Sequence, residues 1–218
     1  MNHRPRVLLA DDHTLLLEAF QRLLEPRCEI VGTAGDGRAL LELASCTRPE
    51  IILLDISMPG INGLDTGAQL RSTLPEVKLI YLTVNEDRDT AAAAIRLGAS
   101  GYLLKSSASG ELFTAIDHAL AGQTYLTPLI TRGVPLAAFL EEAAGTGGEE
   151  LTARQREVLQ LLVQGRAMKE IADRLQITAR TVAFHKYTIM ERLGLKTNAD
   201  LMQYAIEHGL LGPRGNRR

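Results

Sequence analysis

The sequence contains no tryptophan, only two cysteines and few aromatic residues, which make up 4% of the chain. Cys28 and Cys46 have neither CxxC spacing nor a histidine cluster beside them, so we interpret them as buried reduced thiols rather than as metal ligands or a disulfide. The scarcity of aromatic side chains argues against the base-stacking surface of single-strand binders. No apolar run approaches the ~18 residues of a membrane span, and residues 7–10 are too short for a signal peptide. We therefore expect a cytoplasmic protein with no membrane partner.

The length and the charge distribution indicate two domains. The chain has 218 residues, more than the roughly 150 residues typical of one domain. Residues 1–148 carry 12 Lys and Arg against 18 Asp and Glu, whereas residues 149–218 carry 12 against 8. Three glycines within residues 145–148 indicate a flexible connector between an acidic and a basic part, which we expect to bind different partners.

Short apolar runs alternate with amphipathic segments along the acidic part. Strand-like runs occupy residues 6–10, 29–33, 51–54, 77–82 and 101–104. Apolar residues recur at helical spacing over residues 14–24, 38–45, 65–72, 89–97 and 110–121. This alternation predicts an α/β fold with a doubly wound, five-stranded parallel sheet, and a reactive crevice at the carboxyl ends of its strands.

Polar residues follow four of these five strands, at the edge where the crevice would lie. They are Asp11 and Asp12, Asp55, Thr83, and Lys105. An acidic pair alone is more typical of a helix cap, but grouped carboxylates repel one another unless a cation joins them, and oxygen ligands favour Mg²⁺. Lys105 can balance a transferred phosphoryl group, and the Thr83 hydroxyl can donate a hydrogen bond to it. The set therefore predicts phosphoryl transfer to a carboxylate.

Two segments of the acidic part resemble the receiver domains of two-component response regulators: ILLDISMPG at residues 52–60 and GASGYLLK at residues 98–105. The resemblance runs from about residue 4 to residue 122. It implies a flavodoxin-like fold in which Asp55 is the phosphoacceptor, assisted by Thr83 and Lys105. It also implies that Thr83 and Tyr102 are a switch pair that reorients when the aspartate is phosphorylated.

The resemblance further implies the ligands of a Mg²⁺ ion. These are Asp12 and Asp55 directly, the backbone carbonyl of Ser57, and Asp11 acting mainly through water. A rival chemistry for an aspartyl phosphate is that of haloacid-dehalogenase-like phosphohydrolases, which carry a second aspartate two residues after the nucleophile. This chain has Ser57 there, so we expect a phosphoacceptor rather than an enzyme.

The basic part has the pattern of a compact four-helix unit. Four helices are expected, over residues 152–163, 169–175, 178–193 and 198–208. The third of them is capped by Thr178. A short helix, a tight connection and a longer basic helix are typical of a helix-turn-helix, in which the second helix enters the major groove. We interpret Arg180, Lys186 and Arg192 as pointing away from the apolar side of the third helix, which carries Val182 and Ile189.

Several stretches of the basic part are similar to the LuxR-type helix-turn-helix: LTARQREVL at residues 151–159, KEIA at 169–172 and RTV at 180–182. The resemblance covers about residues 149 to 211. It implies that DNA phosphates are contacted by Lys169, Arg180, Thr181 and Lys186, and that base edges are faced by Ala183, Phe184 and Tyr187. Alanine and phenylalanine lack bidentate hydrogen-bonding groups, so readout is expected to depend on thymine methyls and DNA shape.

Together the two parts resemble a response regulator of the NarL/FixJ type. The expected division is a receiver over residues 1–122, a linker over 123–148 and the LuxR-type domain over 149–218. The resemblance implies a sensor histidine kinase as phosphodonor, double-stranded promoter DNA as target, and a homodimer when active. The last helix, with Leu201, Tyr204 and Ala205, is a candidate dimer contact. We interpret His185 as a core residue and the basic tail, residues 213–218, as disordered.

Two alternatives remain open at this stage. The basic helices of a phosphorylation-gated protein can instead dock on a protein or an RNA, which DNA-binding assays against excess competitor would reveal. The receiver can also be one that never takes a phosphoryl group. The complete acidic set argues against that second alternative.

Overall fold

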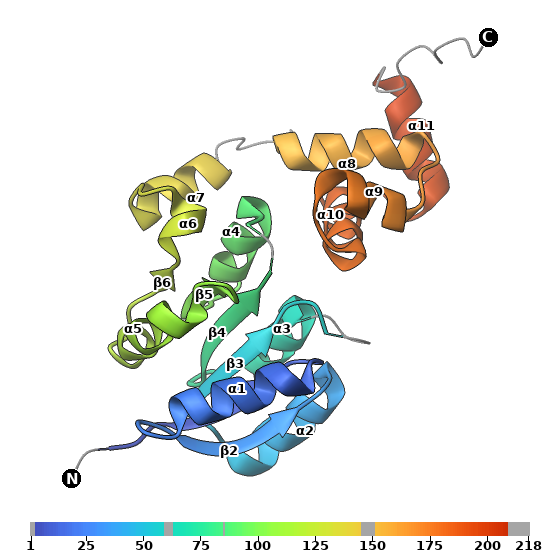
Figure 1. Ribbon diagram of the computed structural model, residues 1–218. Helices are drawn as coiled ribbons and strands as arrows, with labels where there is room; N and C mark the ends of the chain where they lie inside the picture. Colours follow the sequence, from blue (N-terminus) through green and yellow to red (C-terminus); the bar gives the residue numbers. More distant parts are fainter. Residues whose placement is uncertain (1–2, 59–62, 85, 145–150, 209–218) are drawn as a thin grey trace. The chain divides into compact units, whose positions relative to one another are not determined.

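A computed structural model describes residues 3–58, 63–84, 86–144 and 151–208. The chain divides into two compact units, Met1–Phe139 and Leu140–Arg218, which are described separately (Figure 1). No helix among the described residues is both long and apolar enough to cross a membrane. The predicted connector at residues 145–150 and the basic tail at 213–218 lie outside the described residues.

The first unit is built on a fully parallel sheet. Its strands are β1 (Arg6–Ala10), β2 (Glu29–Ala34), β3 (Ile51–Asp55), β4 (Lys78–Thr83), β5 (Gly101–Leu104) and β6 (Tyr125–Leu126), in the order β2-β1-β3-β4-β5-β6. All five residues of β3 are buried, because helices cover both faces of a parallel sheet. This burial explains why the sequence of β3 is an almost continuous apolar run. The predicted parallel α/β sheet is confirmed, with β6 as an additional short strand.

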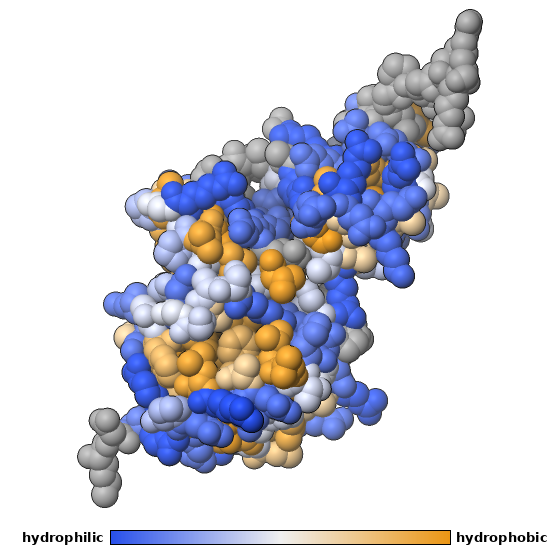
Figure 2. All heavy atoms as spheres, viewed as in Figure 1, coloured by the Kyte–Doolittle hydropathy of each residue, from blue (hydrophilic) through white to orange (hydrophobic). Residues whose placement is uncertain are grey.

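Five helices alternate with these strands: α1 (Thr14–Leu24), α2 (Gly37–Thr47), α3 (Gly63–Thr73), α4 (Arg88–Arg96) and α5 (Ala108–Leu120). Phe20 and Leu24 of α1 share one core cluster with Leu112 and Ile116 of α5 and with the central strands, so both helices cover the same face of the sheet. Figure 2 shows apolar atoms reaching the surface between α5 and α1. The strand order reverses between β1 and β3, which places the crevice of such a sheet at the carboxyl ends of these two strands.

The segment that follows α5 is folded onto the edge of the sheet. Thr127 donates its backbone N–H to the carbonyl of Tyr102, at 3.0 Å. The carboxylate of Glu111 accepts hydrogen bonds from the Tyr125 hydroxyl at 3.0 Å and from the Thr127 hydroxyl at 3.1 Å. Helices α6 (Pro128–Thr131) and α7 (Leu136–Ala144) come next, and the ring of Phe139 is fully buried. Most of the segment expected as a linker, residues 123–148, therefore has defined secondary structure.

The second unit consists of α8 (Ala153–Val163), α9 (Met168–Leu175), α10 (Ala179–Arg192) and α11 (Asn198–Glu207). Each helix start has a local cause in the sequence: Thr152 and Gln155 form a capping box on α8, and Thr178 accepts a hydrogen bond from the Thr181 N–H at the start of α10. The four helices enclose one apolar core, which includes Val158, Leu159, Ile171, Val182, Ile189 and Leu201. The four predicted helices are present, with no end shifted by more than one residue.

The two cysteines differ in environment. Cys28 is buried in the core of the first unit, as expected, whereas Cys46 is exposed near the end of α2. The expectation of two buried thiols is therefore wrong for Cys46, because it lies on the solvent side of an amphipathic helix.

Candidate functional site

Three carboxylates meet where β1 and β3 end. Asp55 is the last residue of β3, and Asp11 and Asp12 follow β1 directly. The side chains of Asp11 and Asp55 are almost completely buried, whereas Asp12 is exposed. One ligand atom from each of these three carboxylates and from His13 can be chosen so that all four lie within 4.8 Å of one another. The predicted convergence of the acidic residues is therefore present in the structure.

Lys105 brings a positive charge into this cluster from the end of β5. Its Nζ lies 2.6 Å from Oδ2 of Asp11 and 3.1 Å from Oδ2 of Asp55, and its side chain is buried. The Lys105 N–H donates to the Thr83 carbonyl at 2.7 Å, which fixes the lysine beside the end of β4. The ammonium group is thus placed to stabilise negative charge on both buried carboxylates.

Burial raises the pKa of Asp55 above its usual value. The Lys105 ammonium and a hydrogen bond from the Ser57 backbone act in the opposite direction, and the charge of Asp11 adds to the increase. A carboxylate that is desolvated to this extent gains stability from any further cation. Apart from the Ser57 backbone N–H, Oδ1 of Asp55 is buried without a hydrogen-bond partner among the described residues, so the site can accept a further ion or donor.

Gly63 holds the start of α3 against the backbone of the central aspartate. Its N–H donates to the Ile56 carbonyl at 3.0 Å. A Cβ atom at this position would lie 2.3 Å from the carbonyl oxygen of Asp55, so only glycine permits this approach. Sequence reasoning did not identify Gly63, although a glycine shortly after the acidic strand was a visible signal.

Thr83 and Tyr102 lie on neighbouring strands, with Thr83 next to Leu104 in the register of β4 and β5. Both side chains are buried, and Tyr102 is completely inaccessible. Burial raises the pKa of the Tyr102 phenol, and the Asp87 charge adds to this, while the Thr83 hydroxyl lowers it. The three residues thus form one electrostatic group between the acidic cluster and the start of α4.

His13 was missed by sequence reasoning as a member of the site. Its Nδ1 lies 3.1 Å from Oδ1 of Asp11 and 3.0 Å from Oδ1 of Asp12. Ser57, the expected source of a backbone ligand, is half-buried two residues after Asp55. The donor set is rich in oxygen and contains one imidazole, which fits a divalent cation.

The second unit contains a helix-turn-helix. Helix α9 ends at Leu175 and is followed by its C-cap residue Gln176, whose φ of 54° is left-handed. Helix α10 begins two residues after Ile177. This left-handed residue closes α9 and turns the chain sharply. The second helix, α10, contacts both α8 and α9, so its orientation is fixed by the core of the unit.

The residues expected to contact DNA differ in exposure. Tyr187 is 63% exposed, Lys169 is exposed, and Arg180, Ala183 and Phe184 are half-buried. Two others, Thr181 and Lys186, are buried on α10.

The orientation expected for Lys186 is wrong. Four residues advance a helix by about one turn and 40°, so Lys186 lies close to the direction of Val182 instead of opposite to it, and both are buried. Its ammonium lies 5.4 Å from the centroid of the Tyr187 ring. His185 is fully buried, as expected of a core histidine.

The apolar surface of α11 also differs from expectation. Leu201 and Ala205 are buried in the core of the unit, and Tyr204 stacks on His208 with ring centroids 3.9 Å apart. The exposed apolar side chains of this helix are Met202 and Ile206, one turn apart. They replace Leu201 and Ala205 as the accessible apolar residues of α11.

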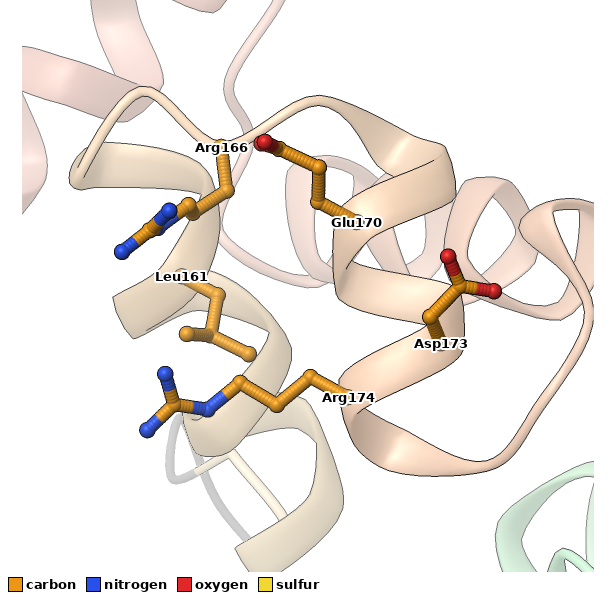
Figure 3. Close-up of a pocket in the computed structure, with 5 residues that line it drawn as sticks. All are labelled: Leu161, Arg166, Glu170, Asp173 and Arg174. Carbon is orange, nitrogen blue, oxygen red and sulfur yellow. The ribbon is translucent and has the colours of Figure 1, made fainter.

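A pocket of about 500 Å³ lies between α8 and α9, lined by Leu161, Arg166, Glu170, Asp173 and Arg174. Figure 3 shows the two guanidinium groups reaching from opposite sides of Leu161, with the two carboxylates on α9. Glu170 accepts a hydrogen bond from the Ala167 N–H at 2.9 Å and so caps α9. Positive and negative side chains are balanced in this pocket, so it does not form a basic surface.

Two family models match the chain, one in each unit. The family described as response regulator receiver domain matches residues 7–117, and the family described as bacterial regulatory proteins, luxR family, matches residues 149–205. The chain belongs to the response regulators that combine a receiver domain with a LuxR-type helix-turn-helix domain. These are DNA-binding transcription regulators.

Two curated relatives match over almost the whole chain. The transcriptional regulatory protein MctR of Rhizobium johnstonii is 36% identical over 219 residues, covering 99% of this chain and 100% of the relative. The oxygen regulatory protein NreC of Staphylococcus aureus is 32% identical over 214 residues, covering 94% and 99%.

A solved structure is similar as well. RcsB of Salmonella enterica serovar Typhimurium, bound to a promoter in the presence of the phosphomimetic BeF3⁻, is 26% identical, with a TM-score of 0.61 over 93% of this chain and 98% of RcsB. The match thus extends over both units.

Proposed function

We propose that this chain is a transcription regulator that is switched by phosphorylation of Asp55. The observation that carries the proposal is the cluster at the end of β3: Lys105 Nζ lies within 3.1 Å of carboxylate oxygens of both Asp11 and Asp55. A carboxylate oxygen of Asp55 would attack the phosphorus of a phosphodonor, and the donor's leaving group would depart as the acyl phosphate forms.

The side chains around Asp55 have distinct roles in this proposal. Lys105 balances the charge of the phosphoryl oxygens, and the Thr83 hydroxyl donates a hydrogen bond to one of them. A Mg²⁺ ion, held by Asp12, Asp55 and the Ser57 carbonyl with Asp11 acting through water, would supply the positive charge that offsets the carboxylates. Because Ser57 stands where a phosphohydrolase carries its second acid, the chain accepts the group without catalytic turnover.

A sensor histidine kinase is the proposed donor, and double-stranded promoter DNA in the cytoplasm is the proposed target. Lys169, Arg180 and Thr181 would contact phosphates, while Ala183, Phe184 and Tyr187 would face the bases. Lys186 would reach a phosphate only by extending its ammonium beyond its buried stem. Dimerisation of the phosphorylated form is proposed because symmetric half-sites fit a two-fold pair of helix-turn-helix units, as in structures of RcsB dimers on DNA.

The switch would operate through Thr83 and Tyr102. If the Thr83 hydroxyl turns toward the phosphoryl group, it leaves space beside the buried Tyr102 ring. Phosphorylation then stabilises the conformer in which the Tyr102 ring occupies this space. The start of α4 lies next to this pair through Asp87, which accepts hydrogen bonds from the Thr90 N–H and hydroxyl.

The decisive experiment measures phosphorylation and DNA binding together. The chain is incubated with Mg²⁺ and a small phosphodonor, and the phosphorylated fraction is separated by gel mobility. Asp55→Asn should abolish the shifted band, whereas the exposed Asp117→Asn should retain it. DNA fragments selected from a genomic library should then bind more tightly after phosphorylation in the parent and not in Asp55→Asn. The proposal would be refuted if the parent never accepts a phosphoryl group, or if the increase in DNA affinity is the same in Asp55→Asn as in the parent.

A further inference from the structure

We propose that His13 is a further metal ligand of the acidic site, and that the site therefore binds a first-row transition-metal ion such as Ni²⁺ or Co²⁺ more tightly than Mg²⁺. The inference rests on the metal site of the proposed function and extends it. Carboxylates and a backbone carbonyl alone suit Mg²⁺, whereas an imidazole ligand selects metals that accept nitrogen.

The spacing of the His13 ring nitrogen fits coordination. Its Nδ1 lies 3.0 Å from Oδ1 of Asp12 and 3.1 Å from Oδ1 of Asp11. Two ligand atoms that meet a metal at right angles, each about 2.1 Å from it, are about 3.0 Å apart. The nitrogen thus has, toward the direct ligand Asp12, the separation of neighbouring corners of an octahedron. Its 3.1 Å approach to Asp11, which acts through water, is a hydrogen-bond distance.

The backbone holds the ring in this position. His13 is the N-cap residue of α1, yet its side chain makes no capping hydrogen bond to the helix. Its own N–H donates to Oδ1 of Asp11 at 2.9 Å, and its carbonyl accepts from the Leu16 N–H at 2.9 Å. The imidazole is therefore turned toward the carboxylates, while its backbone is fixed at both sides.

The charge of the cluster favours a divalent ion. Three carboxylates, of Asp11, Asp12 and Asp55, face one ammonium group, that of Lys105. Oδ1 of Asp55, whose side chain is about 99% buried, has no hydrogen-bond partner among the described residues apart from the Ser57 backbone N–H. An ion of charge +2 neutralises the set and gives this buried oxygen a partner.

His13 can instead act only as a hydrogen-bond donor to the two carboxylates, and the two roles have different consequences for metal choice. A donor that orients carboxylates affects every cation in a similar way. A nitrogen ligand contributes to Ni²⁺ and Co²⁺ and adds little to Mg²⁺, which is bound by oxygen and keeps its waters.

The test is isothermal titration of the untagged full chain with Mg²⁺ and with Ni²⁺. His13→Gln is expected to lower the Ni²⁺ affinity by at least about 10-fold, the least that loss of even an outer-shell partner costs, and to leave the Mg²⁺ affinity within about twofold. Asp12→Asn is expected to weaken both metals, and His208→Gln, which removes an exposed histidine of the second unit, to change neither. Unchanged Ni²⁺ affinity in His13→Gln, or an equal loss for both metals, overturns the proposal. If Asp12→Asn changes the affinity for neither metal, the metal site of the proposed function is refuted as well.

A spectroscopic measurement gives a direct readout of the bond. Mn²⁺ bound to the parent is expected to show nitrogen hyperfine coupling in pulsed EPR, and Mn²⁺ bound to His13→Gln is expected to lack it. A parent spectrum without nitrogen coupling overturns the proposal, even if the affinities change.

Discussion

The guanidinium carbon of Arg88 lies 5.0 Å from the centroid of the Phe139 ring. Arg88 is the first residue of α4, and Phe139 lies in α7, in the segment that leads out of the first unit. The ring is fully buried, so the contact combines a cation–π interaction with apolar burial. It attaches the exit segment to the helix that starts beside Thr83 and Tyr102.

Phe139→Ala is expected to destabilise the first unit by about 3–5 kcal/mol, because it removes a large buried side chain. Arg88→Gln should cost about 0.5–1 kcal/mol, since it removes the cation from the face of the ring. Urea unfolding measures both, with Leu129→Ala, an exposed residue of α6, as the control. Equal losses for Phe139→Ala and Leu129→Ala would contradict the packing described here.

Gly67→Ala is expected to destabilise the first unit by about 1–3 kcal/mol through overpacking. A Cβ at this position in α3 would lie 1.8 Å from the Tyr81 hydroxyl oxygen and 2.8 Å from its Cζ. Adding Tyr81→Phe should restore part of the loss, because the nearest clashing atom is removed. Gly110→Ala in α5 meets nothing within 4 Å and should be neutral or stabilising by about 0.5–1 kcal/mol. Identical effects at the two glycines would show that the close approach to Tyr81 is absent.

Asp55→Asn is expected to stabilise the metal-free protein at neutral pH. The pKa of Asp55 is raised by burial above the usual value of 3.8, so the folded state holds its proton more tightly than the unfolded state does. The parent therefore loses stability as the pH rises from the unfolded to the folded pKa, while Asp55→Asn does not.

Thermal unfolding at a series of pH values, in the presence of a chelator, measures this difference. The unfolding temperature of Asp55→Asn should increase relative to that of the parent as the pH rises from 4 to 7. Each kcal/mol of relative stability corresponds to about 2–4 °C in the unfolding temperature. Asp117→Asn, whose carboxylate is exposed, should follow the parent. A constant difference between parent and Asp55→Asn over this range would contradict the predicted shift.

Arg180→Ala is expected to weaken DNA binding about equally on all sequences and to lower the salt dependence by about one ion. Arg174→Ala is a matched control, since that arginine lines the pocket between α8 and α9 (Figure 3). Fluorescence anisotropy with labelled duplexes at several salt concentrations gives both quantities. Equal losses for the two arginines would place the DNA contact elsewhere than at the start of α10.

A thiol reagent is expected to modify one cysteine of the native chain and two of the unfolded chain. Cys46 is exposed, whereas burial is the main cause of a raised pKa at Cys28, and both effects slow the reaction of Cys28. Cys46→Ser should remove the fast reaction. Two fast thiols in the native parent would show that the first unit opens readily near Cys28.

The strands and their polar ends could be predicted because each lies in a local pattern. Residues 6–10, 14–24 and 101–104 have the predicted bounds, since apolar runs and periodic segments fix them independently of the rest of the chain. The convergence of Asp11, Asp55 and Lys105 follows from the topology of a parallel sheet, in which carboxyl ends share one edge.

Other features depend on tertiary contacts that no local pattern contains. Strand β6 has two residues and exists because Glu111 and the edge of β5 bind it. The position of the His13 ring depends on side-chain direction, which the spacing of apolar residues does not specify. The error at Lys186 has a different origin: counting residues around the helix places it beside Val182, and its charge alone had suggested a solvent-facing position.

The hydrogen bond from the Thr127 N–H to the Tyr102 carbonyl connects the backbone of the buried tyrosine directly to the segment that leads out of the sheet. The strand that bears the buried tyrosine is the direct lateral neighbour of the strand through which the chain leaves the sheet. A displacement of the Tyr102 main chain would therefore reach the exit segment directly, through a hydrogen bond between the two backbones.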